Sequence, residues 1–252
     1  MMKLRVLGSS GWYDTSWANT VCLLIETDDY YVVLDAGGGI YKLDEYVKSD
    51  KPIYLFLSHF HLDHAIGFHV FNKFNFKQGV TVFGQLGTKE VLQTLANSPF
   101  TVPFERLSYK VRVRELPEGQ SGSPDSPFPV EAGYLVHADP CFGYRLTIGE
   151  KIVTYCTDTG YCDNLVKLAR DADLFITECS LRVGEQVNPK WPHLNPELAA
   201  QAAKEAGAKK LLLNHFSAAN YLTLDDREEA KEAVEKIFSS VVIANDGLEL
   251  DI

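Results

Sequence analysis

One six-residue segment constrains this chain more than any other part of it. Residues 59–64 read His-Phe-His-Leu-Asp-His and follow the apolar run at residues 53–57 after a single serine. That run is apolar on both faces and is expected to be a central, buried strand. The chain has only 7 histidines, and neutral imidazole is the commonest transition-metal ligand. Three imidazoles and a carboxylate at one strand end therefore predict a metal site.

The spacing within this segment can serve two ions. Alternate residues of an extended chain point to the same side, so His59 and His61 can share one metal. The turn that follows would direct the side chains of Asp63 and His64 toward the position of a second metal ion. Two-metal hydrolytic centres hold ions roughly 3.5–4 Å apart and need further ligands, usually with a bridging carboxylate. Further candidates stand just after runs of strand residues, namely His137, Asp158 and His215.

The order of predicted elements indicates an α/β (α+β) protein that starts with strands and continues into alternating strands and helices. Short β-branched and aromatic runs predict strands at residues 4–7, 21–26, 30–34, 53–57, 111–115, 130–136, 144–148 and 152–155. Helices are expected at 88–95, at 196–206 between the capping Asn195 and Gly207, and at 224–238. The similar segments LFLSHF (55–60) and LLLNHF (211–216) indicate two facing halves.

Composition narrows the class of protein. A net charge of −10 argues against a general binder of nucleic acid or of anionic membranes, which would need a basic surface. The 5 cysteines show no CxxC spacing and are expected to be reduced thiols in the cytoplasm. Met1 leads straight into a strand-like segment, and no apolar run approaches the ~20 residues that span a bilayer. We expect one domain over residues 1–252, with no membrane association.

Over nearly its whole length the sequence resembles the metallo-β-lactamase superfamily, and within it the ribonuclease Z-like branch. The likeness rests on motifs in the family's order: LGSSG (7–11), DAGGG (35–39), SHFHLDH (58–64), VHADPCFGYR (136–145), TDTG (157–160), TECS (177–180) and NHFS (214–217). Together with the strand-rich N-terminal half and the similar segments at 55–60 and 211–216, this resemblance implies a four-layer αββα sandwich whose metal site lies at one edge between two sheets.

The resemblance also implies roles for single residues. His59, His61 and His137 would hold one metal, Asp63, His64 and His215 the other, and Asp158 would bridge them. A hydroxide between the ions would be the nucleophile. Zinc is expected, since it accepts imidazole and carboxylate ligands and leaves positions open, while manganese and iron stay open. His193 would act on the leaving group and Glu178 would orient it, so that Asp63, His193 and Glu178 form the implied catalytic set.

Other residues near these motifs are expected to be structural. His69 has no counterpart among the family's ligands. Residues 37–39 (Gly-Gly-Gly) are expected to make a turn that lets the backbone approach residues 59–64, the metal loop. Asp35 is expected to support that loop through hydrogen bonds. The Pro- and Gly-rich segment Pro117–Pro129 is either a connection between the halves or an active-site flap, and the connection is slightly favoured.

The chain departs from ribonuclease Z in one respect. Ribonuclease Z carries a long tRNA-gripping arm between the third-motif His and the bridging Asp, but here residues 138–157 read as two strands joined by a turn at Gly149-Glu150. The arm is absent, which argues against long structured RNA as substrate. The di-iron oxygen-reducing relatives have Glu where this chain has His61, so hydrolysis fits better than redox chemistry.

Three functions remain open at this point. The leading one is a metal-dependent phosphodiesterase acting on a small phosphodiester or nucleotide. The second is a lactonase or thioesterase that attacks an acyl carbon with the same two-metal site, and the third is a non-catalytic metal-binding protein. His193 and Glu178 favour the first, because expulsion of an alkoxide benefits from a positioned acid. A homodimer also stays open.

Overall fold

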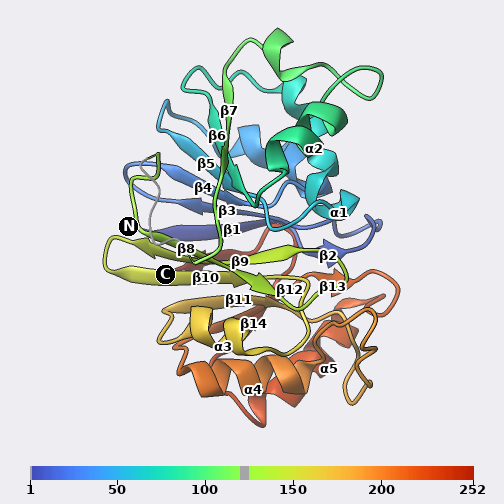
Figure 1. Cartoon of the computed structure of the whole chain (residues 1–252). Helices are drawn as coiled ribbons and strands as arrows, with labels where there is room; N and C mark the ends of the chain where they lie inside the picture. Colours follow the sequence, from blue (N-terminus) through green and yellow to red (C-terminus); the bar gives the residue numbers. More distant parts are fainter. Residues whose placement is uncertain (1, 120–124) are drawn as a thin grey trace.

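A computed structural model of the chain describes residues 2–119 and 125–252. Within these residues two β-sheets face each other, and helices cover the outer face of each sheet (Figure 1). The first half of the chain builds most of one sheet with its helices, and the second half builds the other and adds its last strand to the edge of the first (Figure 1). The predicted four-layer αββα sandwich is confirmed.

The first sheet, in the described residues, mixes an antiparallel edge with a parallel run that begins at its fourth strand. Its spatial order is β15 (Glu249–Asp251), β1 (Lys3–Gly8), β3 (Cys22–Glu26), β4 (Tyr31–Leu34), β5 (Ile53–Phe56), β6 (Val80–Gly84) and β7 (Val111–Glu115). Its outer side carries η1 (Gly38–Glu45), α1 (Leu62–Ala65), η2 (Ile66–Lys73), α2 (Thr88–Leu95) and η3 (Phe104–Arg106).

The second sheet, again in the described residues, has four neighbouring parallel strands followed by two antiparallel ones. Its order is β14 (Val241–Ile243), β12 (Leu211–Asn214), β11 (Leu174–Glu178), β10 (Lys151–Cys156), β9 (Cys141–Ile148) and β8 (Val130–Leu135). Because β8 and β10 are both antiparallel to β9, and β10, β11 and β12 run parallel, the strands β8, β10 and β12 end at one edge. Helices α3 (Asp163–Ala169), α4 (Pro196–Ala206) and α5 (Leu224–Glu235) cover this sheet.

A short parallel bridge joins the two halves beside that edge. β2 (Ser10–Gly11) pairs with β13 (Phe216–Ser217), so a segment from the start of the chain lies next to the segment that follows β12. Arg227 of α5 is fully buried behind this bridge and donates to the Ser9 hydroxyl at 2.8 Å and to the Ala244 carbonyl at 2.6 Å. The bridge thereby holds residues of both halves in one register.

Helix α4 shows how local sequence fixes an element. The Asn195 side chain accepts a hydrogen bond from the Leu198 amide, Pro196 opens the first turn, and Gly207 ends the helix at a φ of 66°. These boundaries were predicted from the sequence. The next predicted helix was too long: α5 ends at Glu235 instead of residue 238, because the Val234 carbonyl accepts from both Ile237 and Phe238 in a tight final turn.

The segment Pro117–Pro129 lies partly outside the described residues, at positions 120–124. Its described flanks connect β7 of the first sheet to β8 of the second. Phe128 packs against Tyr30 and Tyr54, which stand at the beginnings of β4 and β5, at the end of the sheets opposite the metal loop. The positions of these flanks agree with the interpretation of the segment as a connection between the halves. None of the helices in the described ranges has the length and apolar character needed to cross a membrane.

Aromatic rings from both sheets fill the space between them. Phe56 of β5 stacks on Phe83 of β6 at a centroid distance of 4.9 Å, and it meets Tyr144 of β9 edge-on at 5.3 Å. Phe56 and Tyr144 are fully buried. Side-chain burial between the sheets therefore supplies much of the free energy that holds the two halves together.

We expect Phe56→Ala to lower the free energy of unfolding by about 3–5 kcal/mol, because it leaves a cavity between the sheets. Denaturant titration followed by circular dichroism measures this change. Phe100→Ala is the matched control, since Phe100 is 68% exposed, and it should alter stability by no more than about 0.5 kcal/mol. Equal effects of the two variants would contradict this account of the core.

Candidate metal centre

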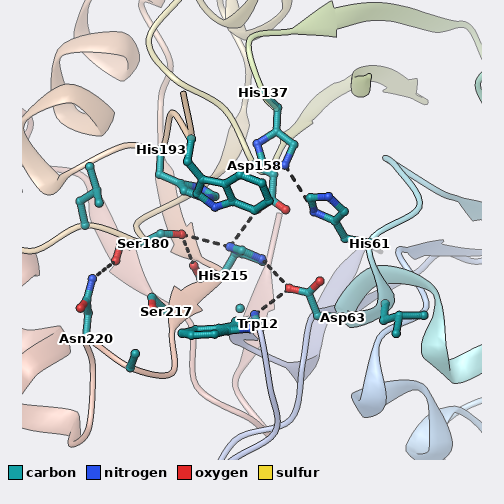
Figure 2. A pocket seen from close by; sticks show the side chains of 15 residues that line it. Trp12, His61, Asp63, His137, Asp158, Ser180, His193, His215, Ser217 and Asn220 are labelled. Atoms are coloured by element: carbon teal, nitrogen blue, oxygen red, sulfur yellow. Dashed lines mark hydrogen bonds and ion pairs between the residues drawn. The ribbon is translucent and has the colours of Figure 1, made fainter. Parts of the chain in front are cut away.

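Each sequence-predicted metal-binding side chain lies at the edge where the parallel strands end. His59 follows β5, His137 follows β8, Asp158 follows β10 and His215 follows β12. Figure 2 shows His61, Asp63, His137, Asp158 and His215 converging on one pocket. The pattern of His or Asp after a strand brings these side chains together because strand ends of both sheets meet at this edge.

His59, His61, His137 and Asp158 form the first cluster. Their donor atoms all lie within 4.8 Å of one another. His137 Nε2 is 3.4 Å from His61 Nδ1, and His59 Nε2 is 3.1 Å from Asp158 Oδ2. The spacing assigned His59 and His61 to one metal, and the resemblance added His137 to it and made Asp158 the bridge.

The second cluster is formed by Asp63, His64 and His215, whose donor atoms also lie within 4.8 Å. His64 Nε2 is 3.1 Å from His215 Nε2, and Asp63 Oδ2 is 3.3 Å from the same atom of His215. Asp158 Oδ2 lies 2.9 Å from His64 Nε2, so this carboxylate contacts both clusters. Asp63 and His64 were expected in a loop, but they stand in the short helix α1, whose turn aims both at the second cluster.

The residues present fit divalent cations at both clusters. Imidazole nitrogens face each other at 3.1 and 3.4 Å, and in the described chain His137 Nδ1 is buried without a hydrogen-bond partner. Burial lowers the pKa of His59 and, with neighbouring imidazoles, lowers the pKa of His137 to about 4. Both rings are therefore neutral near pH 7, which is the form that binds metal.

The carboxylates of the site attract positive charge. Burial alone would lower the pKa of His215, but Asp158 and Asp63 outweigh it and raise that pKa to about 10. The pKa of Asp63 is depressed despite its burial, chiefly by His64 and His215. A site that stabilises a proton so strongly will also stabilise a cation, which completes the fit.

Several polar groups hold the second nitrogen of a donor imidazole. Asp35 Oδ2 lies 2.7 Å from His64 Nδ1, Asp139 Oδ2 lies 2.9 Å from His61 Nε2, and Ser180 Oγ lies 3.2 Å from His215 Nδ1. Such contacts fix ring orientation and strengthen a ligand. Of these three, only Asp35 was predicted from the sequence. Asp139 and Ser180 were not predicted, although they lie inside the family-like motifs at 136–145 and 177–180.

His193 and Glu178 form a pair beside the two clusters. His193 Nδ1 lies 2.8 Å from Glu178 Oε1, and the donor atoms of Asp158, Glu178 and His193 lie within 4.8 Å of one another. Glu178 is fully buried and accepts hydrogen bonds from the amides of Thr159 and Ser180. Burial alone would lower the pKa of His193, but Glu178 outweighs it and the net shift is upward.

The glycines and His69 occupy structural positions, as expected. A Cβ at Gly37 would lie 2.3 Å from the Asp63 carbonyl oxygen, so a side chain there would push the metal loop away. His69 is exposed, and its Nδ1 lies 2.6 Å from the Ile66 carbonyl oxygen. It belongs to none of the three donor clusters found in the described residues.

The site opens into a pocket of about 730 Å³. Its lining includes His61, Asp63, His137, Asp158, His193 and His215, together with Gly11 at its edge. The volume falls within the ~300–1,000 Å³ typical of pockets that bind small molecules.

We expect Gly11→Ala to displace His215 and to weaken metal binding at the second cluster by about 10–100-fold, as when a ligand loses its proper orientation. The physical reason is a clash, because a Cβ at Gly11 would lie 2.4 Å from Cε1 of His215. Metal content after dialysis against graded chelator measures the effect. Gly133→Ala is the control, since its Cβ would meet nothing closer than 3.6 Å. Unchanged metal retention in Gly11→Ala would refute the clash.

Comparison with known proteins agrees with this geometry. The profile of the family described as Beta-lactamase superfamily domain matches residues 30–216. The probable metallo-hydrolase YhfI of Bacillus subtilis is 32% identical over 222 residues, covering 85% of this chain and 87% of the relative. The crystal structure of YhfI superposes with a TM-score of 0.82 at 26% identity, over 99% of this chain and 98% of that one.

A ribonuclease Z is similar at a lower level. That of Macrococcus caseolyticus is 24% identical over 312 aligned positions, covering 100% of both chains. Because this chain has only 252 residues, the relative carries inserted residues. The fold, the convergent histidines and carboxylates, and these matches show that the chain belongs to the metallo-β-lactamase superfamily of metal-dependent hydrolases.

Proposed function

We propose that this protein is a metal-dependent phosphodiesterase that cleaves small phosphodiesters or nucleotides. The observation that carries the proposal is the His193–Glu178 pair, 2.8 Å apart, in which His193 lines the pocket beside both donor clusters and Glu178 is buried behind it. Hydrolysis of a phosphodiester expels an alkoxide, which departs more readily when it receives a proton. Glu178 occupies Nδ1 of His193 and leaves Nε2 as the nitrogen that can donate this proton.

Two divalent cations would bind at the clusters, and zinc suits the mixture of imidazole and carboxylate donors. We assign His59, His61 and His137 to one ion, Asp63, His64 and His215 to the other, and Asp158 to both. When bound, the ions would lower the pKa of water and stabilise negative charge on phosphate oxygens. The supporting contacts from Asp35, Asp139 and Ser180 would keep the donor rings oriented during turnover.

Small substrates fit this chain better than tRNA. β9 and β10 form a plain hairpin over residues 141–156, where ribonuclease Z would carry its arm. The net charge of −10 disfavours a polyanion, whose affinity depends on many basic contacts. The 24% identity to a ribonuclease Z supports phosphodiester chemistry, while the missing arm limits the size of the substrate.

A second candidate function is hydrolysis of an acyl carbon in a lactone or thioester. The apolar side chains of Leu62 and Leu181 in the pocket lining favour it, because they could contact an acyl chain. Assays of metal-loaded protein on bis(p-nitrophenyl) phosphate, a cyclic nucleotide, a tRNA precursor, a lactone and a thioester separate the two. Turnover of the acyl substrates alone would replace our first proposal with the second.

We further propose a cytoplasmic location. The 5 cysteines are free thiols, four of them buried, and Cys22, Cys141 and Cys156 lie inside the packed sheets. Proteins with unpaired thiols are typical of reducing compartments.

We expect His193→Ala to reduce turnover of an unactivated phosphodiester by ~10²–10⁴-fold without changing metal content, since positioned general acids contribute about that factor. With a p-nitrophenyl diester the loss should be much smaller, because p-nitrophenolate departs without a proton. Steady-state kinetics on both substrates measure the difference.

Glu178→Gln is the companion variant, since it keeps the shape of the side chain but removes the charge that orients His193. It should show the same dependence on the leaving group, with a smaller loss. Comparable losses on both substrates for His193→Ala would assign it to phosphate binding instead, and no loss on either would make it structural.

A further inference from the structure

Two large aromatic side chains stand exposed at the wall of the pocket. Trp12 is 68% exposed and Trp191 is 49% exposed, and both line the cavity that contains the metal-binding clusters. Indole rings are among the side chains that gain most from burial. Two exposed tryptophans in one concave site therefore indicate a ligand that covers them.

Trp12 is held in a costly backbone conformation. Its φ is 76°, which is a rare value for a bulky residue and is retained where the surroundings enforce it. The Trp12 amide donates a hydrogen bond to Asp63 Oδ2 at 2.6 Å, and the Tyr13 ring packs edge-on at 5.2 Å. Figure 2 shows Trp12 on the wall next to Asp63 and His215. The strain thus fixes an indole beside the second cluster.

Trp191 lies beside the first cluster. Its ring is parallel to the His61 ring within 10° at a centroid distance of 5.6 Å, and its centroid is also 5.6 Å from that of His137. The loop that carries it is braced by Pro192, since a Cβ at Gly160 would lie 2.8 Å from the Pro192 Cβ. Each donor cluster therefore has one tryptophan beside it.

The charge of the lining restricts what can bind there. Among the described residues, the side chains that line the pocket include no Lys or Arg. Asp63 and Asp158 add negative charge to it. Apart from the His193 imidazole, positive charge for a substrate would come from the bound cations, so a single phosphodiester monoanion fits better than a substrate with a second phosphate.

We propose that the substrate is a nucleoside phosphodiester and that the Trp12 indole stacks on its base, with Trp191 forming the aromatic wall on the side of the first cluster. The phosphate would lie at the metal clusters and the flat, uncharged base would cover the exposed ring. Base–aromatic stacking tolerates any base, because each has a π-face. This inference rests on the proposed phosphodiesterase activity and names its substrate class.

Two esters with the same leaving group test the proposal. Thymidine 5′-phosphate p-nitrophenyl ester carries a base, and ethyl p-nitrophenyl phosphate does not. We expect metal-loaded protein to prefer the thymidine ester in kcat/KM, and Trp12→Leu to reduce that preference by about 5–100-fold, as expected for one lost stacking contact. Trp12→Phe should retain most of it, because a ring remains on the same strained backbone.

The control variant is Phe100→Leu. Phe100 is as exposed as Trp12, at 68%, but it does not line the pocket. This variant should leave the preference unchanged. Equal losses in Trp12→Leu and Trp12→Phe would overturn the proposal, because they would mean that Trp12 shapes the backbone and does not stack.

A binding measurement separates this inference from the proposed function. Calorimetry on metal-loaded protein compares thymidine 5′-methylphosphonate with methyl methylphosphonate, which both carry one negative charge. The thymidine compound should bind about 5–100-fold more tightly, and Trp12→Leu should remove that difference. If neither ester is cleaved, the phosphodiesterase proposal fails, and the inference about its substrate fails with it. If both are cleaved but base and Trp12 affect neither selectivity nor affinity, only the stacking inference fails.

Discussion

The candidate site depends most on the hydrogen bonds made by the buried carboxylate of Asp35. Asp35 is fully buried at the end of β4, with a φ of 58°, and it accepts hydrogen bonds from the Ser58 amide at 2.7 Å and from the Tyr155 hydroxyl at 2.6 Å. The same side chain lies 2.7 Å from His64 Nδ1. A buried carboxylate is tolerated only when it is fully hydrogen-bonded. Asp35 therefore joins the first sheet, the second sheet and the metal loop at one point.

This arrangement separates a rigid part of the site from parts carried on loops. Most of the candidate metal-binding side chains stand just after strands, and Asp63 and His64 stand in the short helix α1. These elements hold the side chains in place, as precise metal binding requires. His193 and Trp191 instead stand in the loop between β11 and α4, and Trp12 stands in the loop after β2. Loops on a rigid scaffold commonly set specificity. Under the proposed function, the metal-binding geometry would stay fixed while leaving-group chemistry and substrate choice would depend on these loops.

The sequence predicted the fold and the candidate metal-binding residues because both follow local rules. Residues 59–64 lie just after a strand in the sequence. His137, Asp158 and His215 each stand just after a strand as well. Asp139, Ser180 and Trp12 escaped prediction for a physical reason. Asp139 matters only because it meets His61, which is 78 positions away along the chain. The strained φ of Trp12 follows from its contact with Asp63, 51 positions away. Such contacts exist only after segments far apart in the sequence have packed together.

The acidic surface and the site impose opposite electrostatic demands. A net charge of −10 repels anions in general, but this repulsion is screened beyond about 8 Å at physiological ionic strength. Cations bound at the two clusters would act strongly within that range, and stacking on an indole acts only at contact. A substrate with one phosphate inside the pocket and an uncharged ring against its wall satisfies both demands. A long polyanion would keep most of its charges outside the pocket, where the acidic surface opposes them.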